Sequence, residues 1–318
     1  MIHMDNKSIL ITGGTGSLGK ALVRRLLPTR PNRLAILSRD ELKQSEMKTE
    51  FPETGPIRYF LGDVRNLSRL TQAFRGANIV IHTAAMKQVP SCESHPRETI
   101  ATNVMGAINV IDAATANKVD KVVALSTDKA CYALNTYGAA KLLSDKLFTH
   151  TEMPTNFHQT IFSVVRYGNV AGSRGSVIPF YLKLGDTQQQ LPVTHRDMSR
   201  FWLDLDCAVD AVMYALENAI GGEIFVPQCP SFYIYDLAKV INPHKEPIIV
   251  GLRPGEKINE SLIAQPNAYR TTFQDGYYVI HPYRRLPNIG IDLEYTSDAN
   301  KDWLRGKELR TAVEELHE

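Results

Sequence analysis

The stretch Ser8-Ile-Leu-Ile-Thr-Gly-Gly-Thr-Gly-Ser-Leu-Gly19 decides the fold of this chain. Its first five residues are an apolar run that predicts a buried strand, and residues 20–27 have the apolar spacing of an amphipathic helix. Glycines between a strand and a helix allow a tight turn, close approach of a pyrophosphate and close helix–strand packing. We therefore predict a dinucleotide site at this turn, lined by Gly13, Thr15, Gly16, Ser17, Leu18 and Gly19.

Strand and helix patterns continue to alternate through the first half of the chain. Further strands are predicted at 33–38, 58–61, 78–82, 122–125 and 160–166, and a helical region at 103–116. This alternation predicts an α/β fold with a Rossmann-like, doubly wound parallel sheet. Beyond residue 170, glycine and proline interrupt shorter elements. We expect a dinucleotide-binding domain at 1–170, to which 200–220 returns, and a smaller, interleaved substrate-binding cap formed mainly by 171–318.

The end of the second predicted strand concerns the choice of cofactor. Dinucleotide sites that prefer NAD usually place an acidic residue there, on the ribose hydroxyls. Here the strand ends at Ser38 and Arg39, and Lys43 follows one helical turn later. Two cations suit a 2′-phosphate, so we predict NADP, although Asp40 leaves NAD open. Later strand ends supply the other expected cofactor contacts: Asp63, Val64, Ala84, Ala85 and Lys87.

A second stretch, residues 126–141, combines several reactive side chains. Thr127, Asp128 and Lys129 follow a predicted strand, at the edge where open α/β sheets bind ligands. Tyr137 and Lys141 are four residues apart on a predicted helix, so they share one face. A cation on that face would lower the pKa of the phenol and prepare Tyr137 as a base. We also expect Tyr137 and Lys141 to contact the cofactor.

Composition narrows the classes of partner. The chain has 318 residues, a net charge of +2 and 43% hydrophobic residues, as in ordinary soluble proteins. This charge balance argues against nucleic-acid binding, and no apolar run approaches the roughly 20 residues that span a bilayer. The N-terminus lacks a signal-peptide core, so a cytoplasmic location is expected. Four cysteines without metal-ligand spacing predict reduced thiols and no metal site.

These motifs together resemble the extended short-chain dehydrogenase/reductases, and among them the inverting UDP-N-acetylglucosamine 4,6-dehydratases. Three of the matching strings are SerThrAspLysAla at 126–130, TyrGlyAlaAlaLys at 137–141 and ArgProGlyGluLys at 253–257. The other matching strings lie at residues 12–19, 38–47, 164–170, 173–177 and 200–202. Two segments depart from the family pattern. Residues 131–135 lack the usual proline, and 194–198 differ in a nucleotide-contacting loop, which puts contact details there in doubt.

The resemblance implies a mechanism. Tyr137 and Lys141 would serve oxidation at C4, Thr127 would hold the C4 oxygen, and Lys129 and Asp128 would act as base and acid in water elimination across C5 and C6. Hydride would return to C6, and reprotonation of C5 from the opposite face would invert it. Salt bridging could instead make Asp128 the base and Lys129 the acid, and both assignments stay open.

The resemblance also implies the partners of the site. The substrate would be UDP-N-acetylglucosamine, the product would enter pseudaminic-acid-type sugar synthesis, and the chain would form a homo-oligomer. The expected substrate contacts are Lys87, Asn169, Arg174, Val177, Thr194, Arg200, Arg253 and Glu256.

Three alternatives compete with this interpretation. A UDP-sugar 4-epimerase would use Tyr137 and Lys141 but would give Asp128 and Lys129 no work. A C5-retaining dehydratase would usually be larger, anchored in a membrane and without the active tyrosine. An NADP-sensing regulatory protein would usually have lost the tyrosine–lysine pair.

Overall fold

The computed structural model describes residues 4–150, 160–173, 175–185, 190–283, 291 and 294–317. Within them, a nine-stranded sheet has the order β13-β14-β9-β6-β5-β4-β1-β2-β3. Strands β9 to β3 in this order pair in parallel, and β13 and β14 add an antiparallel edge. The strands are β1 (Ser8–Thr12), β2 (Arg33–Ser38), β3 (Ile57–Leu61), β4 (Ile79–His82), β5 (Lys121–Thr127), β6 (Ile161–Tyr167), β9 (Ile224–Pro227), β13 (Thr271–Gln274) and β14 (Tyr277–Ile280). The predicted α/β fold with a large parallel sheet is confirmed.

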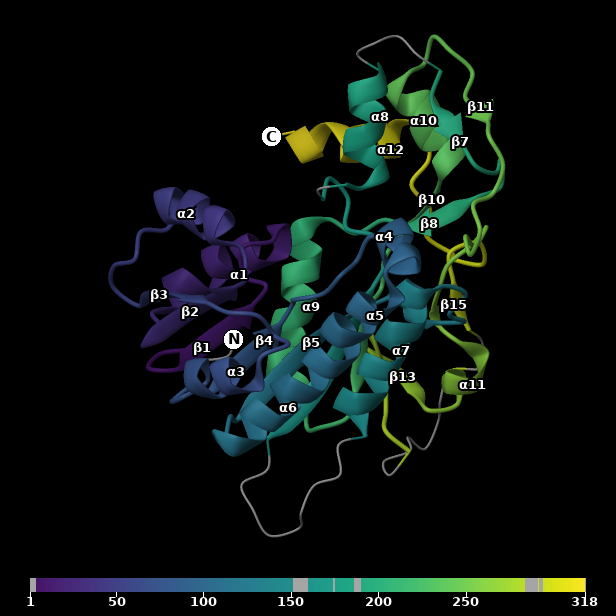
Figure 1. The fold of residues 1–318 in the computed structure, drawn as a ribbon. Coiled ribbons are helices and arrows are strands. Elements are labelled where there is room, and N and C mark those ends of the chain that lie inside the picture. The colour runs from purple at the N-terminus through teal and green to yellow at the C-terminus, as the bar shows by residue number, and fades with distance from the viewer. Residues whose placement is uncertain are drawn as a thin grey trace.

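Two groups of helices cover this sheet (Figure 1). Helix α1 packs on α9, while α6 packs on both α3 and α7. The helices are α1 (Ser17–Leu26), α2 (Glu41–Glu50), α3 (Leu67–Ala73), α4 (Val89–Ser94), α5 (Pro96–Thr99), α6 (Gly106–Ala116), α7 (Thr136–Thr149) and α9 (Leu205–Asn218). The region 103–116, predicted as helical, comprises the end of a π-helical segment (Ile100–Met105) and all of α6, which follows it directly.

A smaller lobe lies beyond one edge of the sheet, where Figure 1 shows α8, α10 and α12 together. It has its own apolar core, which includes Tyr181, Trp202, Phe232 and Leu237. Its helices are α8 (Val177–Gly185), α10 (Ile234–Ile241) and α12 (Gly306–Glu314). Short strand pairs support it or join it to the main lobe: β8 (Ser199–Phe201) with β10 (Ser231–Tyr233), β7 (Pro192–Val193) with β11 (Ile248–Ile249), and β12 (Ser261–Ile263) with β15 (Tyr295–Thr296); α11 (Gln265–Ala268) follows β12.

The C-terminal half contributes to both lobes. Helix α9 packs on β5, β6 and β9, and β9, β13 and β14 belong to the main sheet. The sheet therefore contains segments at 224–227 and 271–280 in addition to the strands of the first half. A functional division of the chain at residue 170 stays a prediction.

Two glycines explain the turn that the sequence singled out. Gly13 has φ 67°, and a Cβ there would lie 2.7 Å from the Ala84 nitrogen at the end of β4. A Cβ on Gly19 would lie 2.3 Å from the Gly14 carbonyl oxygen. Only glycine permits both the left-handed backbone and the close packing of α1 on the turn.

Two further features bear on the expected setting of the protein. All four cysteines are free thiols; Cys207 is exposed and the others are buried. Among the described residues, no helix combines the length and apolar character required to cross a membrane.

Candidate active site

A cleft of about 1510 Å³ runs along the carboxyl edge of the sheet and reaches under the small lobe. It begins at the glycine turn after β1 and extends past the ends of β4, β5 and β6 to the loop around Arg253. The predicted residues that line it are Gly13, Thr15, Gly16, Ser17, Leu18, Gly19, Ser38, Arg39, Lys43, Asp63, Val64, Ala84, Ala85, Lys87, Thr127, Lys129, Tyr137, Lys141, Asn169, Val177, Thr194, Arg200, Arg253 and Glu256. Asp128 is buried directly behind this wall, and Arg174 lies outside the described residues.

At one end of the cleft, the glycine turn is joined to the end of β2. The Thr15 and Ser38 hydroxyls lie 2.9 Å apart, and the Asp40 N–H donates to Ser38 Oγ at 3.2 Å. Gly16 begins α1 without a side-chain cap, so the first N–H groups of the helix are left for a ligand. This end therefore suits a pyrophosphate.

The charged side chains near the end of β2 form ion pairs that bear on the choice between NADP and NAD. Asp40 caps α2 by accepting from the Lys43 N–H at 3.0 Å, and its carboxylate lies 3.1 Å from Lys43 Nζ. Arg39 is exposed and lies 3.8 Å from Asp63, whose carboxylate is bound mainly by Arg65. Asp40 is thus engaged by its own helix, while the Arg39 guanidinium remains on the cleft wall.

The start of α7 is fixed against the turn that follows β5. Asn135 caps the helix by accepting from the Gly138 N–H at 2.9 Å, and its Nδ2 donates to the Gly255 carbonyl at 3.2 Å. A Cβ on Gly138 would lie only 2.2 Å from the Lys129 carbonyl oxygen. The missing side chain therefore allows α7 to pack on the turn and places Tyr137 beside Thr127 and Lys129.

Tyr137 and Lys141 are the pair predicted on this helix. Burial raises the pKa of Tyr137 to about 12, while the Lys129 charge and the Thr127 hydroxyl act to lower it. Burial lowers the pKa of Lys141, and the charge of Asp145 opposes that change. The cation that lowers the pKa of this phenol most is Lys129, and not Lys141 as the helical spacing predicts.

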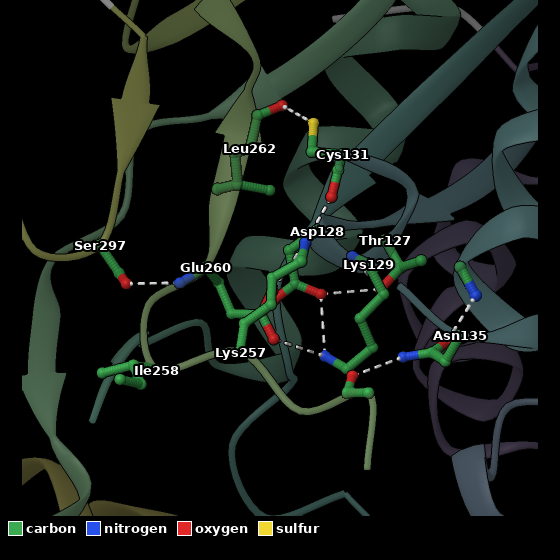
Figure 2. A network of polar contacts seen from close by, with 12 residues as sticks. Thr127, Asp128, Lys129, Cys131, Asn135, Lys257, Ile258, Glu260, Leu262 and Ser297 are labelled. Atoms are coloured by element: carbon green, nitrogen blue, oxygen red, sulfur yellow. Dashed lines mark hydrogen bonds and ion pairs between the residues drawn. The ribbon is translucent and has the colours of Figure 1, made fainter. Parts of the chain in front are cut away.

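Asp128 and Lys129 form an ion pair at the end of β5 (Figure 2). Lys129 Nζ lies 3.0 Å from Asp128 Oδ1 and donates to Asn169 Oδ1 at 3.1 Å. The Thr127 hydroxyl donates to the same Asp128 oxygen at 2.9 Å. Asp128 Oδ2 is buried and has no hydrogen-bond partner in the described parts of the chain. A buried carboxylate oxygen without a partner can take up a proton from a neighbouring acid.

The charges of this pair stabilise each other. Burial acts to lower the pKa of Lys129, but Asp128 and Glu260 outweigh it and raise this pKa. Burial acts to raise the pKa of Asp128, but Lys129 and the Thr127 hydrogen bond outweigh it and lower that pKa. The pair is therefore an ammonium and a carboxylate at neutral pH.

Glu260 belongs to the same cluster, and the sequence analysis did not predict this. Its carboxylate lies 3.5 Å from Lys129 Nζ and 3.5 Å from Lys257 Nζ. Its only sequence clue is its position three residues after the ArgProGlyGluLys string. Nothing in that spacing indicates contact with Lys129, which lies 131 positions earlier in the chain.

The predicted substrate-binding residues differ in how many contacts their side chains make within the protein. Arg200 donates to the carbonyls of Ser199 at 2.6 Å, Ile258 at 2.8 Å and Lys257 at 3.0 Å. Thr194 contacts Met198 Sδ at 3.2 Å. Arg253 is exposed, and its backbone N–H donates to Glu256 Oε2 at 3.0 Å. Arg253 lines the cleft, and its guanidinium has no hydrogen bond or ion pair with the residues that the structure describes. Arg200 serves mainly to hold the 257–258 backbone.

Comparison with known proteins identifies the family of this chain. Residues 9–282 match the family described as "Polysaccharide biosynthesis protein". UDP-N-acetylglucosamine 4,6-dehydratase (inverting) of Campylobacter jejuni subsp. jejuni serotype O:23/36 is 46% identical over 323 residues, covering 96% of each chain. The chain belongs to the polysaccharide biosynthesis protein family. Its predicted resemblance to the inverting dehydratases is confirmed.

One further relative and one solved structure are also similar to this chain. UDP-glucose 4-epimerase of Rickettsia bellii is 41% identical over 298 residues, covering 91% of this chain and 85% of its own. The X-ray structure of Pen from Bacillus thuringiensis has a TM-score of 0.92 and 35% identity, covering 99% of this chain and 100% of that one. The chain therefore shares its overall fold with Pen over nearly its whole length.

A buried charge network lies between α7 and the main sheet. Arg166 on β6 donates from Nη2 to Asp145 Oδ2 at 2.9 Å, and from Nη1 to the Leu262 carbonyl at 3.1 Å. Ser126 donates to the same Asp145 oxygen at 2.7 Å. This network joins β5, β6, α7 and β12, and its anion also faces Lys141.

We expect Asp145→Asn to lower the free energy of unfolding by about 3 kcal/mol, because the Arg166 guanidinium would remain buried without its anion. Urea denaturation at pH 7 measures this. The matched control is Glu246→Gln, which breaks the exposed pair with Lys239 and should change stability little. Equal effects of the two variants would contradict a stabilising role for the buried pair.

Proposed function

We propose that this protein converts UDP-N-acetylglucosamine to UDP-2-acetamido-2,6-dideoxy-β-L-arabino-hex-4-ulose, by elimination of water with inversion at C5. The observation that carries the proposal is the ion pair of Asp128 and Lys129. Lys129 lines the cleft beside Tyr137, and Asp128 is buried behind it. Oxidation alone needs the tyrosine, whereas elimination needs a second acid and base. The relative from Campylobacter jejuni is named as an inverting UDP-N-acetylglucosamine 4,6-dehydratase.

A bound nicotinamide dinucleotide would supply the hydride acceptor at C4 and return the hydride at C6. The uncapped start of α1 fits its pyrophosphate, and the residues that would hold it are those of the glycine turn together with Ser38, Arg39, Lys43, Asp63, Val64, Ala84, Ala85, Lys87, Tyr137 and Lys141. The engagement of Asp40 with Lys43 supports NADP over NAD, because it leaves the Arg39 guanidinium on the cleft wall to bind a 2′-phosphate.

Tyr137 would take the proton of the C4 hydroxyl as the carbon is oxidised. Only the phenolate can accept this proton, and the pKa of about 12 favours the neutral phenol. The phenol must therefore first release its own proton to solvent, and the Lys129 charge and the Thr127 hydroxyl would stabilise the phenolate that results. Lys141, on the same face of α7, would bind the cofactor and add a second positive charge.

Asp128 and Lys129 would carry the elimination that the C4 ketone makes possible. In our proposal Lys129 takes the C5 proton and Asp128 protonates the departing C6 hydroxyl. Because the free protein holds the ion pair, one proton must first pass from Lys129 to Asp128 across their 3.0 Å contact. The opposite assignment, with Asp128 as base, needs no such transfer and is the alternative to be tested.

Cations of the small lobe would bind the UDP part of the substrate. Arg253 presents a free guanidinium, and its loop is closed by Glu256. The remaining proposed contacts are Lys87, Asn169, Arg174, Val177, Thr194 and Arg200, of which Arg174 lies outside the described residues. A homo-oligomer, a cytoplasmic location and a place in pseudaminic-acid-type synthesis stay predictions.

A UDP-sugar 4-epimerase is the second candidate, since the Rickettsia bellii relative has that name at 41% identity. Such an enzyme needs hydride transfer at C4 but neither proton loss at C5 nor a leaving hydroxyl. The Asp128–Lys129 pair favours the dehydratase.

Incubation of the purified protein with UDP-N-acetylglucosamine, without added cofactor, should give a product lighter by one water. In D₂O this product should contain solvent deuterium at C5, and NMR of the sugar ring should show inversion there. Tyr137→Phe should bind UDP as tightly as the wild type but form no product, because the C4 proton has no acceptor. A product of unchanged mass would indicate the epimerase instead.

Arg39→Asp should weaken NADP binding by about 10- to 100-fold, as expected for loss of a hydrogen bond to a charged group. Calorimetric titration with NADP and NAD separately measures the change. The control, Arg310→Asp on α12, alters an exposed arginine outside the cleft and should leave both affinities unchanged. A wild-type preference for NAD would contradict the role of Arg39.

Lys129→Ala should exchange hydride with the cofactor more slowly than the wild type, because Tyr137 loses the charge that most lowers its pKa. This exchange is visible as transient absorbance near the nicotinamide band, but no deuterium should enter C5. Asp128→Asn should exchange C5–H in D₂O yet lose no water. Loss of the Asp128 charge lowers the pKa of Lys129, so that this lysine can give its proton to solvent, while the C6 hydroxyl lacks its acid. Mass spectrometry of the recovered sugar nucleotide separates the two. The reverse pattern would assign the base to Asp128 and the acid to Lys129.

A further inference from the structure

Glu260 is a buried carboxylate at the centre of three cations. It is 3% exposed and immediately precedes β12. Its carboxylate oxygens lie 3.5 Å from Lys129 Nζ, 3.5 Å from Lys257 Nζ and 3.9 Å from Arg200 Nε. Oε2 has no hydrogen-bond partner in the described residues, so these charges are its main compensation.

The backbone around Glu260 is held firmly. Its N–H donates to Ser297 Oγ at 2.9 Å, and this hydroxyl lies 2.6 Å from Ser199 Oγ at the start of β8. Figure 2 shows Glu260 facing Lys129 from the opposite side to Thr127. Segments from the small lobe and its junction therefore bring one anion to the lysine that also contacts Asp128.

We propose that Glu260 is a positioning residue for the elimination step, whose carboxylate holds the Lys129 ammonium against Asp128 and sets the pH at which this pair can exchange protons. The inference rests on the proposed dehydration. It adds a third ionisable group to the two that perform the proton transfers.

The sign of the effect follows from the charges around Lys129. The groups that face it are Asp128 beside it, Tyr137 from α7, Arg200 from β8, and Glu260 with Lys257 from the loop before β12. A nearby negative charge raises the pKa of any group, because it favours the protonated form of both an amine and an acid. Removal of Glu260 should therefore make both Lys129 and Asp128 lose their protons at lower pH.

We expect Glu260→Gln to move both limbs of the pH profile of kcat to lower pH by about 1 unit, in the direction given by loss of one close anion. This direction is the same whichever of Asp128 and Lys129 is the base. Lys257→Met removes the cation that compensates Glu260, so its profile should move to higher pH. Thermal unfolding monitors folding of each variant, and Glu260→Asp, which keeps the charge, should restore the wild-type profile in part.

The matched control is Glu223→Gln, a second buried glutamate, which accepts from the Gly221 N–H at 2.8 Å. It lies just before β9, at the amino edge of the sheet, and its profile should not move. Unshifted profiles in Glu260→Gln and Lys257→Met, or shifts of both in one direction, would overturn the inference. If Glu260→Gln does not fold, the direction of the Lys257→Met shift decides. A wild-type protein without dehydratase activity would instead refute the proposed function.

Discussion

The buried contact between Lys129 and Asp128 is the interaction on which the rest of the site depends. An ammonium and a carboxylate taken out of water are stable only when each is compensated at close range. The structure meets this need from several directions: Thr127 donates to Asp128, Asn169 accepts from Lys129, and Glu260 adds a second anion. Thr127 ends β5, Asn169 follows β6 and Glu260 precedes β12, so the site joins segments that are far apart in the sequence.

The packing of α7 on the turn after β5 provides the required precision. Gly138 lets the helix approach the Lys129 carbonyl more closely than any side chain would allow. Asn135 caps the same helix and also reaches the Gly255 carbonyl, next to the exposed Arg253. The loop proposed to bind the UDP phosphates is thereby attached to the helix that carries Tyr137. Lys257 strengthens this attachment by donating to the Cys131 carbonyl.

The electrostatics of the cleft suit a reaction that must store and return protons. Burial disfavours the phenolate of Tyr137 and the ammonium of Lys141, whereas the Asp128–Lys129 pair stays ionised. The resting site thus has charges that compensate each other and a neutral phenol. In such a low-dielectric cluster, a change at one group alters the proton affinity of its neighbours, so the steps at C4, C5 and C6 would be coupled through Lys129.

The local sequence by itself determined the sheet, the glycine turn and the reactive stretch at 126–141. Strands β1 and β2 begin and end where the apolar runs do, since a buried parallel strand must be apolar along its length. Tyr137 and Lys141 share a face because helical spacing is fixed. Only the tertiary structure decided that Lys129 lies against Glu260, that Arg200 is engaged by backbone carbonyls, and that β13 and β14 complete the sheet. Each of these depends on long-range packing between segments whose separation along the chain contains no information about their distance in space.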